Sequence, residues 1–246
     1  TLPHRGDEDA GAMMRITTIG LDADDTLWHN ERMFHLTQAR FADLLADHAG
    51  KDHLAERLLA AERRNLGHYG FGVKGFMLSM IETAIEVTDG KVPGHVIAEI
   101  MEAGRAMLAE PIELLPGVPE TIARLAPDYR LILITKGDLL DQERKLAQSG
   151  LDEMFDAVEI VSNKTPAAYA SIFARHGEGA EAALMAGNSM ASDVVAPLMA
   201  GAWGVHVPHG MEWALEFAEP PLEQQRYRRI STLDELPDLV HWIDGS

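Results

Sequence analysis

Side chains that could do chemistry together occur at four places in this sequence, each at the end of a short apolar segment. They are Asp22 and Asp24 after Ile16–Leu21, Thr135 at the end of Leu131–Thr135, Lys164 after Ala157–Val161, and Asn188 with Asp193 after Ala183–Ala186. If these segments are strands of one parallel sheet, their carboxyl ends meet at one edge, where such sheets bind ligands. Carboxylates, a hydroxyl, an ammonium group and a carboxamide would then share one site.

The spacing of Asp22 and Asp24 suggests phosphoryl transfer. Residues two apart in an extended chain point the same way, and neighbouring carboxylates repel each other unless a cation lies between them or one stays protonated. A hard dication such as Mg²⁺ prefers oxygen ligands and would also offset the repulsion between a carboxylate and a phosphate. Asp22 can then attack phosphorus as a nucleophile, and Asp24 can act as general acid and then as general base.

Thr135 and Lys164 complete the predicted site. The Thr135 hydroxyl and nearby backbone N–H groups can hold phosphate oxygens, and Lys164 offers a fixed positive charge to the transition state. Each signal is weak alone, because a single Thr or Lys is usually structural, but four signals in order, each at its own strand, point to one site. The predicted catalytic residues are Asp22, Asp24, Thr135 and Lys164, and the predicted phosphate-binding residues are Thr135, Lys136 and Gly137.

The elements that must position these residues alternate between strands and helices. Further strands are predicted at Trp203–Val207 and Arg229–Ser231, and the predicted helices cover Leu139–Gln148, Pro166–Arg175 and Ser192–Ala200. Thr232, with Glu235 three residues later, is a capping box that begins a last helix. Strands alternating with single helices predict an α/β fold with a doubly wound, mostly parallel, Rossmann-like sheet.

A helical block interrupts this alternation after the first strand. Residues 31–109 carry apolar side chains at helical spacing, which predicts about four amphipathic helices with breaks at Gly50, Gly67–Gly75 and Asp89–Gly94. The Gly67–Gly75 segment is either a plain helix–helix loop or a loop that enters the site and places Lys74 or Tyr69 on the substrate. Trp28 either gates the pocket or packs beneath the helices. Lys74 and Trp28 are therefore added as candidate substrate-binding residues.

On these residues the chain resembles a phosphatase of the haloacid dehalogenase (HAD) superfamily. The four motifs of that superfamily correspond to Asp22–Thr26 (DADDT), Thr135, Lys164 and Gly187–Asp193 (GNSMASD). Leu115–Val118 (LPGV) resembles the point where such chains re-enter the core after a helical cap. The resemblance implies a core of residues 14–27 and 111–246, with an all-α helical cap domain at residues 28–110.

The resemblance also implies chemistry. Mg²⁺ would be bound by Asp22, the backbone carbonyl of Asp24 and the side chains of Asn188 and Asp193, and Asp22 would form a phospho-aspartyl intermediate. Asn188 stands where the fourth motif commonly has an acid, so the ion would be held with one charge fewer.

Three functions follow from this pattern. The leading hypothesis is a Mg²⁺-dependent phosphatase for a small phosphorylated metabolite. A 2-haloacid dehalogenase-type hydrolase is the first alternative, although the namesake dehalogenases typically lack the second acid, which is present here as Asp24. A non-catalytic relative that binds a phosphorylated ligand is the second alternative, suggested by the neutral Asn188.

The amino-acid composition limits the kinds of binding partner that this protein can have. In 246 residues, 39 acidic against 21 basic side chains give a formal net charge of −18, which argues against nucleic acid and anionic membranes. The absence of cysteine excludes disulfides and thiolate catalysis, and no apolar run approaches the roughly 18 residues of a membrane span. The polar, aperiodic residues 1–13 predict a flexible tail, and we expect a cytoplasmic protein. Neither the oligomeric state nor the particular phosphate ester follows from the sequence.

Overall fold

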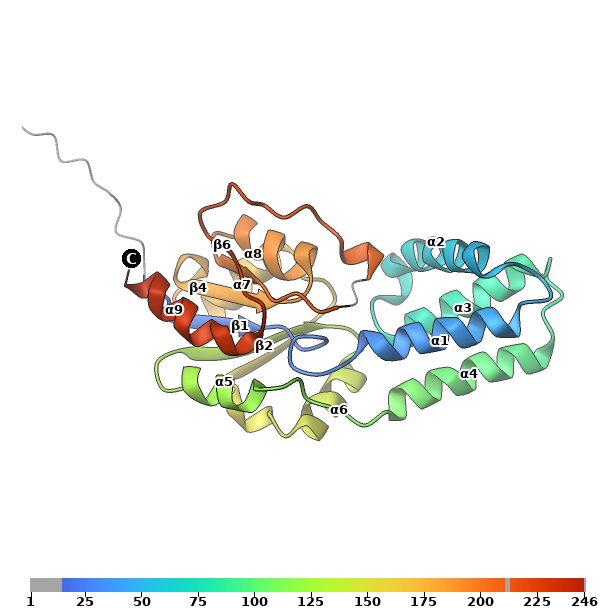
Figure 1. Ribbon diagram of the computed structural model, residues 1–246, viewed down its shortest axis with the longest axis horizontal. Coiled ribbons are helices and arrows are strands. Elements are labelled where there is room, and N and C mark those ends of the chain that lie inside the picture. The colour runs from blue at the N-terminus through green and yellow to red at the C-terminus, as the bar shows by residue number, and fades with distance from the viewer. Residues whose placement is uncertain (1–14, 211–212, 246) are drawn as a thin grey trace, which may run out of the picture.

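The computed structural model describes residues 15–210 and 213–245. Within them a six-stranded sheet has the order β3-β2-β1-β4-β5-β6 (Figure 1). The strands are β1 (Thr18–Leu21), β2 (Arg130–Lys136), β3 (Ala157–Val161), β4 (Ala183–Gly187), β5 (Trp203–His206) and β6 (Tyr227–Arg229). Every neighbouring pair is parallel. The predicted parallel sheet is therefore confirmed, with β6 beginning two residues earlier than expected.

Helices cover both faces of the sheet (Figure 1). One face carries α5 (Val118–Leu125), α6 (Leu139–Ser149) and α9 (Leu236–Asp244), and the other carries α7 (Pro166–His176) and α8 (Ala196–Met199). Successive strand residues point to opposite faces, so Leu131 and Leu133 enter the first core while Ile132 and Ile134 enter the second. Burial on both faces explains why β2 is almost continuously apolar.

The predicted helical insertion follows β1 and is confirmed. It consists of α1 (Glu31–Leu44), α2 (Lys51–Tyr69), α3 (Val73–Val87) and α4 (Gly94–Ala109), and it extends away from the sheet in Figure 1. The insertion has an apolar core of its own, in which Phe41, Leu58, Phe76, Met80 and Ile100 are buried. Its helices span residues 31–109, within the range 28–110 that we expect for a cap.

The prediction of a glycine-rich break over residues 67–75 is wrong in length, because only Gly70–Gly72 lies between α2 and α3. Gly70 and Gly72 have φ values of 71° and 106°, which favour glycine. Gly67 and Gly75 lie inside the helices. A Cβ atom at Gly75 would come within 2.8 Å of the Gly70 carbonyl oxygen, so Gly75 permits a close backbone contact and does not end the helix.

The other helices show two differences. In place of one helix over residues 192–200, the chain forms a π-helical turn at Met190–Val195 and then the short α8, where Pro197 has no N–H to continue a regular ladder. The helix α5 has no counterpart among the predicted elements. The capping box of Thr232 and Glu235 is confirmed, at a 3₁₀ turn that leads into α9.

The expected tail, residues 1–13, lies outside the described residues. Among the helices that the structure describes, none combines the length and the apolar character needed to cross a membrane.

Candidate active site

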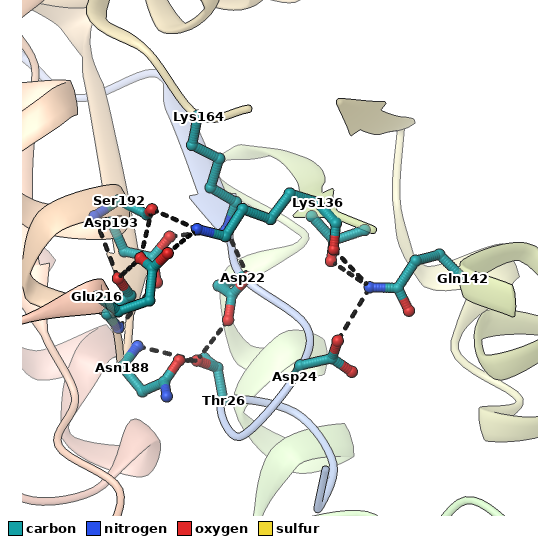
Figure 2. Close-up of polar contacts among 12 residues, drawn as sticks. Asp22, Asp24, Thr26, Lys136, Gln142, Lys164, Asn188, Ser192, Asp193 and Glu216 are labelled. Carbon is teal, nitrogen blue, oxygen red and sulfur yellow. Dashed lines mark hydrogen bonds and ion pairs between the residues drawn. The ribbon is translucent and has the colours of Figure 1, made fainter. Parts of the chain in front are cut away.

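The carboxyl ends of β1, β2, β3 and β4 meet at one edge of the sheet, where a cavity of about 140 Å³ lies between the core and the insertion. The predicted site residues that line this cavity are Asp22, Asp24, Thr135, Lys136, Gly137, Lys164, Asn188 and Asp193. Figure 2 shows how most of these side chains point toward one another. The structure therefore brings together all the predicted site residues except Lys74 and Trp28.

Lys164 lies between two carboxylates. Its Nζ is 2.5 Å from Oδ1 of Asp22 and 2.7 Å from Oδ1 of Asp193, and all three residues are buried. Burial opposes the charge of Lys164, but the two carboxylates outweigh it and raise the lysine pKa above its ordinary value. Burial, with repulsion from Asp193, raises the pKa of Asp22 to about 7 against the attraction of Lys164. The predicted nucleophile thus lies beside a permanently charged ammonium group.

The loops after β1 and β4 hold each other in place. Thr26 Oγ1 donates to Oδ2 of Asp22 at 3.1 Å and accepts the N–H of Asn188 at 3.1 Å. A Cβ atom at Gly187 would lie 2.4 Å from Oδ2 of Asp193, so glycine at the end of β4 makes room for that carboxylate. Thr26 therefore joins the two loops by hydrogen bonds, and Gly187 leaves the space that the Asp193 carboxylate occupies.

Asp24 is held by three donors. Trp28 Nε1 and Lys145 Nζ lie 2.8 and 2.9 Å from its Oδ1, and Gln142 Nε2 lies 3.0 Å from its Oδ2. Lys145 Nζ also donates to Oδ1 of Asn30 at 2.8 Å, next to the start of the insertion. Gln142 and Lys145 belong to none of the predicted motifs. Their spacing of three residues on one helix that begins beside the site is the signal that could have identified them.

Gln142 also organises the end of β2. Its Nε2 lies 2.8 Å from Thr135 Oγ1 and 3.1 Å from the Lys136 carbonyl oxygen. Gly137 has a φ of 145°, and a Cβ atom there would lie 3.3 Å from Gln142. Gln142 therefore links the predicted phosphate-binding hydroxyl to Asp24, the predicted general acid.

Lys136 forms a largely buried network with Glu216. Its Nζ pairs with Glu216, donates to Ser192 Oγ at 2.7 Å and lies 4.0 Å from the ring centroid of Phe71 in the α2–α3 connection. Burial lowers the pKa of Lys136, opposed by the attraction of Glu216. Burial acts to raise the pKa of Glu216, but Lys136 and two serine hydroxyls hold it below its ordinary value. The ion pair is therefore the stable form of these two side chains.

The segment between β5 and β6 brings Glu216 to the site. The Glu216 carboxylate accepts hydrogen bonds from Ser189 and Ser192, and Trp213 packs its ring edge-on to Phe71 with centroids 5.9 Å apart. The two serines lie within the GNSMASD motif, but neither Glu216 nor Trp213 carries any sequence signal of its role. Contacts of this kind depend on a long-range approach that local patterns do not encode.

Lys74 and Trp28 do not line the cavity. Lys74 Nζ lies 2.9 Å from both carboxylate oxygens of Asp138, which joins the first turn of α3 to the N-cap of α6. Trp28 is buried and donates its indole N–H to Asp24, so its contact supports packing beneath the site. Tyr69, the other candidate of the glycine-rich segment, is also outside the lining. Substrate binding by Lys74 or Trp28 stays a prediction.

The donor groups of the cavity fit a hard dication. Asp22 and Asp193 carry two negative charges against the one positive charge of Lys164, and the amide Oδ1 of Asn188 adds a neutral oxygen with a long contact of 3.4 Å to Thr26. A residual negative charge with oxygen donors is the environment that Mg²⁺ prefers. These three side chains, with the Asp24 carbonyl, are the groups that would hold it.

A second group of ligand-type side chains has another explanation. Ligand atoms of Asp25, His29 and His209 lie within 4.8 Å of one another. However, both oxygens of Asp25 accept backbone N–H groups at 2.9 Å, from Asn30 and Glu31. The Asp25 carboxylate therefore fixes the start of the insertion, which accounts for its burial.

The fold and the site together define a class of protein. The chain matches the family described as haloacid dehalogenase-like hydrolase over residues 16–201. It is also 38% identical to a haloacid dehalogenase-like family hydrolase from Xanthomonas campestris, whose crystal structure superposes with a TM-score of 0.83 and covers 95% of this chain and 97% of that chain. The protein belongs to the haloacid dehalogenase-like hydrolase family.

Matches at lower identity show the fold alone. A candidate HAD-hydrolase from Bacillus subtilis, solved with bound magnesium, is 18% identical with a TM-score of 0.64, covering 92% of this chain and 99% of that chain. An L-2-haloacid dehalogenase from Xanthobacter autotrophicus is 18% identical with a TM-score of 0.61 and the same two coverages. The matching structures carry names of phosphatases as well as dehalogenases. No curated protein matches the chain.

Proposed function

We propose that the protein is a Mg²⁺-dependent phosphatase that hydrolyses a small phosphorylated metabolite through a phospho-aspartyl intermediate on Asp22. The observation that carries this proposal is the second carboxylate, Asp24, held at the same cavity by Trp28, Gln142 and Lys145. The alkoxide that leaves a phosphate ester needs a proton, which a carboxyl group can deliver. A halide leaves as a stable anion and needs none, so the second acid favours a phosphatase over a dehalogenase.

The proposed reaction has two displacements at phosphorus. A carboxylate oxygen of Asp22 attacks phosphorus, the bond from phosphorus to the ester oxygen breaks, and Asp24 protonates the departing oxygen. Asp24 then takes a proton from water as the water oxygen attacks phosphorus, and the bond from phosphorus to Asp22 breaks to release phosphate.

The remaining side chains orient the reactants and stabilise charge. Lys164 holds the Asp22 carboxylate in position. We expect the Thr135 hydroxyl and the Lys136 ammonium group, which line the same cavity, to bind phosphoryl oxygens. Mg²⁺ bound by Asp22, Asn188 and Asp193 would supply positive charge against the repulsion between the carboxylate and the incoming phosphate.

We assign the helical insertion, residues 28–110, as a cap on a core of residues 14–27 and 111–246. Its contacts with the core at the site include Phe71 over the Lys136 ammonium group and the Lys74–Asp138 ion pair. A cap in this position excludes water from the reaction and selects the substrate.

The test is hydrolysis of p-nitrophenyl phosphate with Mg²⁺ and after its removal by a chelator. We expect phosphate release only with the metal. Asp22→Asn removes the nucleophile and should lower kcat/KM by at least about 1,000-fold. Asp24→Asn should keep substrate binding but lower kcat by roughly 100- to 10,000-fold, because a carboxamide cannot transfer the proton. Asp152→Asn, at an exposed carboxylate outside the cavity, is the matched control and should retain activity.

Other outcomes identify other functions. Full activity of Asp22→Asn contradicts the mechanism. Chloride release from 2-chloropropionate without metal, in the absence of phosphate release, would assign a dehalogenase. Binding without turnover across a broad panel of phosphate esters would assign a non-catalytic ligand-binding relative.

A further inference from the structure

The part of the cavity that the insertion contributes is acidic. Among the described lining residues, the insertion supplies two carboxylates, Glu31 of α1 and Glu62 of α2, and no lysine, arginine or histidine. The lysines in the lining come from the core and are paired there with core carboxylates: Lys136 with Glu216, Lys145 with Asp24, and Lys164 with Asp22 and Asp193. The cations of the cavity are thus engaged away from Glu31 and Glu62.

Glu62 is a buried carboxylate with an unsatisfied oxygen. It is 7% exposed, and its Oε2 is buried with no hydrogen-bond partner, while Trp213 donates to the side chain. Glu31 has one cationic candidate nearby, the half-exposed His35 at 3.7 Å. Burial raises the pKa of each carboxyl group to about 7. A ligand that brings a donor to Glu62 would recover the free energy that this unpaired oxygen costs.

The neighbouring polar groups do not provide that donor. Asn65 Nδ2 donates to Ser79 Oγ at 3.1 Å and to a carboxylate oxygen of Glu82 at 2.7 Å. The Ser79 hydroxyl donates in turn to the Gly75 carbonyl oxygen at 2.9 Å. Phe34 and Phe76, with ring centroids 5.0 Å apart, line the same part of the cavity. Asn65 and Ser79 are therefore engaged elsewhere, and a ligand in the cavity can supply the donor to Glu62.

The cavity also limits the size of the ligand. Its volume is about 140 Å³, and an engineered cavity of roughly 150 Å³ holds a benzene molecule. With a phosphoryl group at Thr135 and Lys164, the remaining space takes a short organic chain. A chain of this length would place the group that meets Glu62 a few bonds from phosphorus.

We propose that the organic part of the substrate carries an ammonium group that is bound by Glu31 and Glu62, so that the protein acts on a small phosphate monoester of an amino alcohol. This inference rests on the proposed phosphatase function and adds the chemical class of the substrate. An ammonium group supplies three donors and a positive charge, which satisfies Oε2 of Glu62 and offsets the negative charge of the insertion. A hydroxyl group in its place supplies one donor and no charge.

The first test compares 2-aminoethyl phosphate with 2-hydroxyethyl phosphate, which has the same length and no cation. We expect kcat/KM to favour the ammonium ester by roughly 10- to 100-fold, as for a hydrogen bond between charged groups. Glu62→Gln keeps the shape of the side chain and removes its charge, so it should bring this ratio close to one. The control is Glu102→Gln, the same exchange at an exposed carboxylate of α4 that pairs with Arg105, and it should leave the ratio unchanged.

A binding measurement separates this inference from the proposed function. Isothermal titration calorimetry with 2-aminoethylphosphonate and 2-hydroxyethylphosphonate requires no turnover. We expect the wild-type protein to bind the amine at least about tenfold more tightly, and Glu62→Gln to lose that preference. Equal affinity, or tighter binding of the hydroxyl compound, overturns the inference even if aryl phosphate is hydrolysed. An intact preference for the amine without any phosphatase activity overturns the proposed function alone.

Discussion

Lys164 neutralises one of the two carboxylates that it contacts, Asp22 and Asp193, and one negative charge remains in buried surroundings. The largely buried ion pair of Lys136 with Glu216 is balanced. Removing one partner of a buried pair typically costs about 3–5 kcal/mol, because the other charge is left uncompensated. Replacing a residue of this site therefore affects stability as well as the proposed chemistry, and variants that preserve charge or shape are the informative ones.

Ionisation of Glu62 should make the free energy of unfolding depend on pH. Burial raises its pKa from 4.5 to about 7 in the folded protein, so the folded state favours the protonated form. Its contribution to the free energy of unfolding is complete below about pH 4.5 and is lost as the pH rises through about 7. Glu62→Gln stays neutral, so it should be more stable than wild type above pH 7 by up to about 3 kcal/mol, with no such advantage near pH 4.

Urea unfolding from pH 4 to pH 8 measures this difference. Glu102→Gln, at an exposed carboxylate, should follow the wild-type curve within about 0.5 kcal/mol. A stability difference for Glu62→Gln that is constant over the whole pH range would show that ionisation of this side chain is not its origin.

At the scale of elements, the central strands β1, β2 and β4 were predictable because burial on both faces makes them short, largely apolar runs. The helices of the insertion were predictable because each has one apolar stripe. Helix ends were less predictable. A glycine such as Gly75 is typical of a loop in sequence. In the structure its missing side chain permits a close contact with the Gly70 carbonyl oxygen, and only the tertiary structure shows this contact.

The residues of the candidate site also fall into those that the sequence could predict and those that it could not. Asp22, Thr135, Lys164 and Asp193 could be predicted because each lies at the end of a strand or in the segment after it, and strand ends converge by topology. The roles of Gln142 and Lys145 could not be predicted, because the sequence does not show which face of α6 meets the loop after β1. Glu216 reaches Lys136 from the segment between β5 and β6, 80 residues further along the chain, and no periodicity marks such a partner.

The contact between α3 and α6 allows a prediction about elements. Asp138 has two roles, since its carboxylate binds Lys74 and also accepts the N–H of Asp141 as the N-cap of α6. A partly exposed ion pair contributes about 0–1 kcal/mol, and a lost N-cap costs about 1 kcal/mol. Asp138→Asn, which keeps a capping side chain, and Lys74→Met should therefore lower the free energy of unfolding by similar small amounts.

Asp138→Ala loses both roles and should be less stable than Asp138→Asn by about 1 kcal/mol. Chemical denaturation of the three variants gives the comparison. Equal stability of Asp138→Ala and Asp138→Asn would show that the cap contributes nothing and that the ion pair alone accounts for the residue.

At the scale of the whole molecule, the formal charge of −18 opposes the approach of any phosphate ester. The lysines of the cavity, Lys136, Lys145 and Lys164, act in the opposite direction but only at short range, because each is paired with a carboxylate. A phosphate ester approaching from solvent therefore meets repulsion first and attraction last. The net effect on the approaching ester depends on the distances over which the acidic surface repels it and the cavity lysines attract it.

Ionic strength separates these two fields. The Debye length is about 30 Å at 0.01 M and about 8 Å at 0.15 M, so added salt screens the distant acidic surface before it screens the lysines beside the phosphate. At saturating Mg²⁺ we therefore expect kcat/KM for a phosphate ester to rise several-fold between these two salt concentrations, while kcat changes little because the bound substrate is already in contact with the lysines. Steady-state kinetics in potassium chloride measure both constants. A fall in kcat/KM with salt would show that the positive field of the cavity, and not the charge of −18, controls how the substrate arrives.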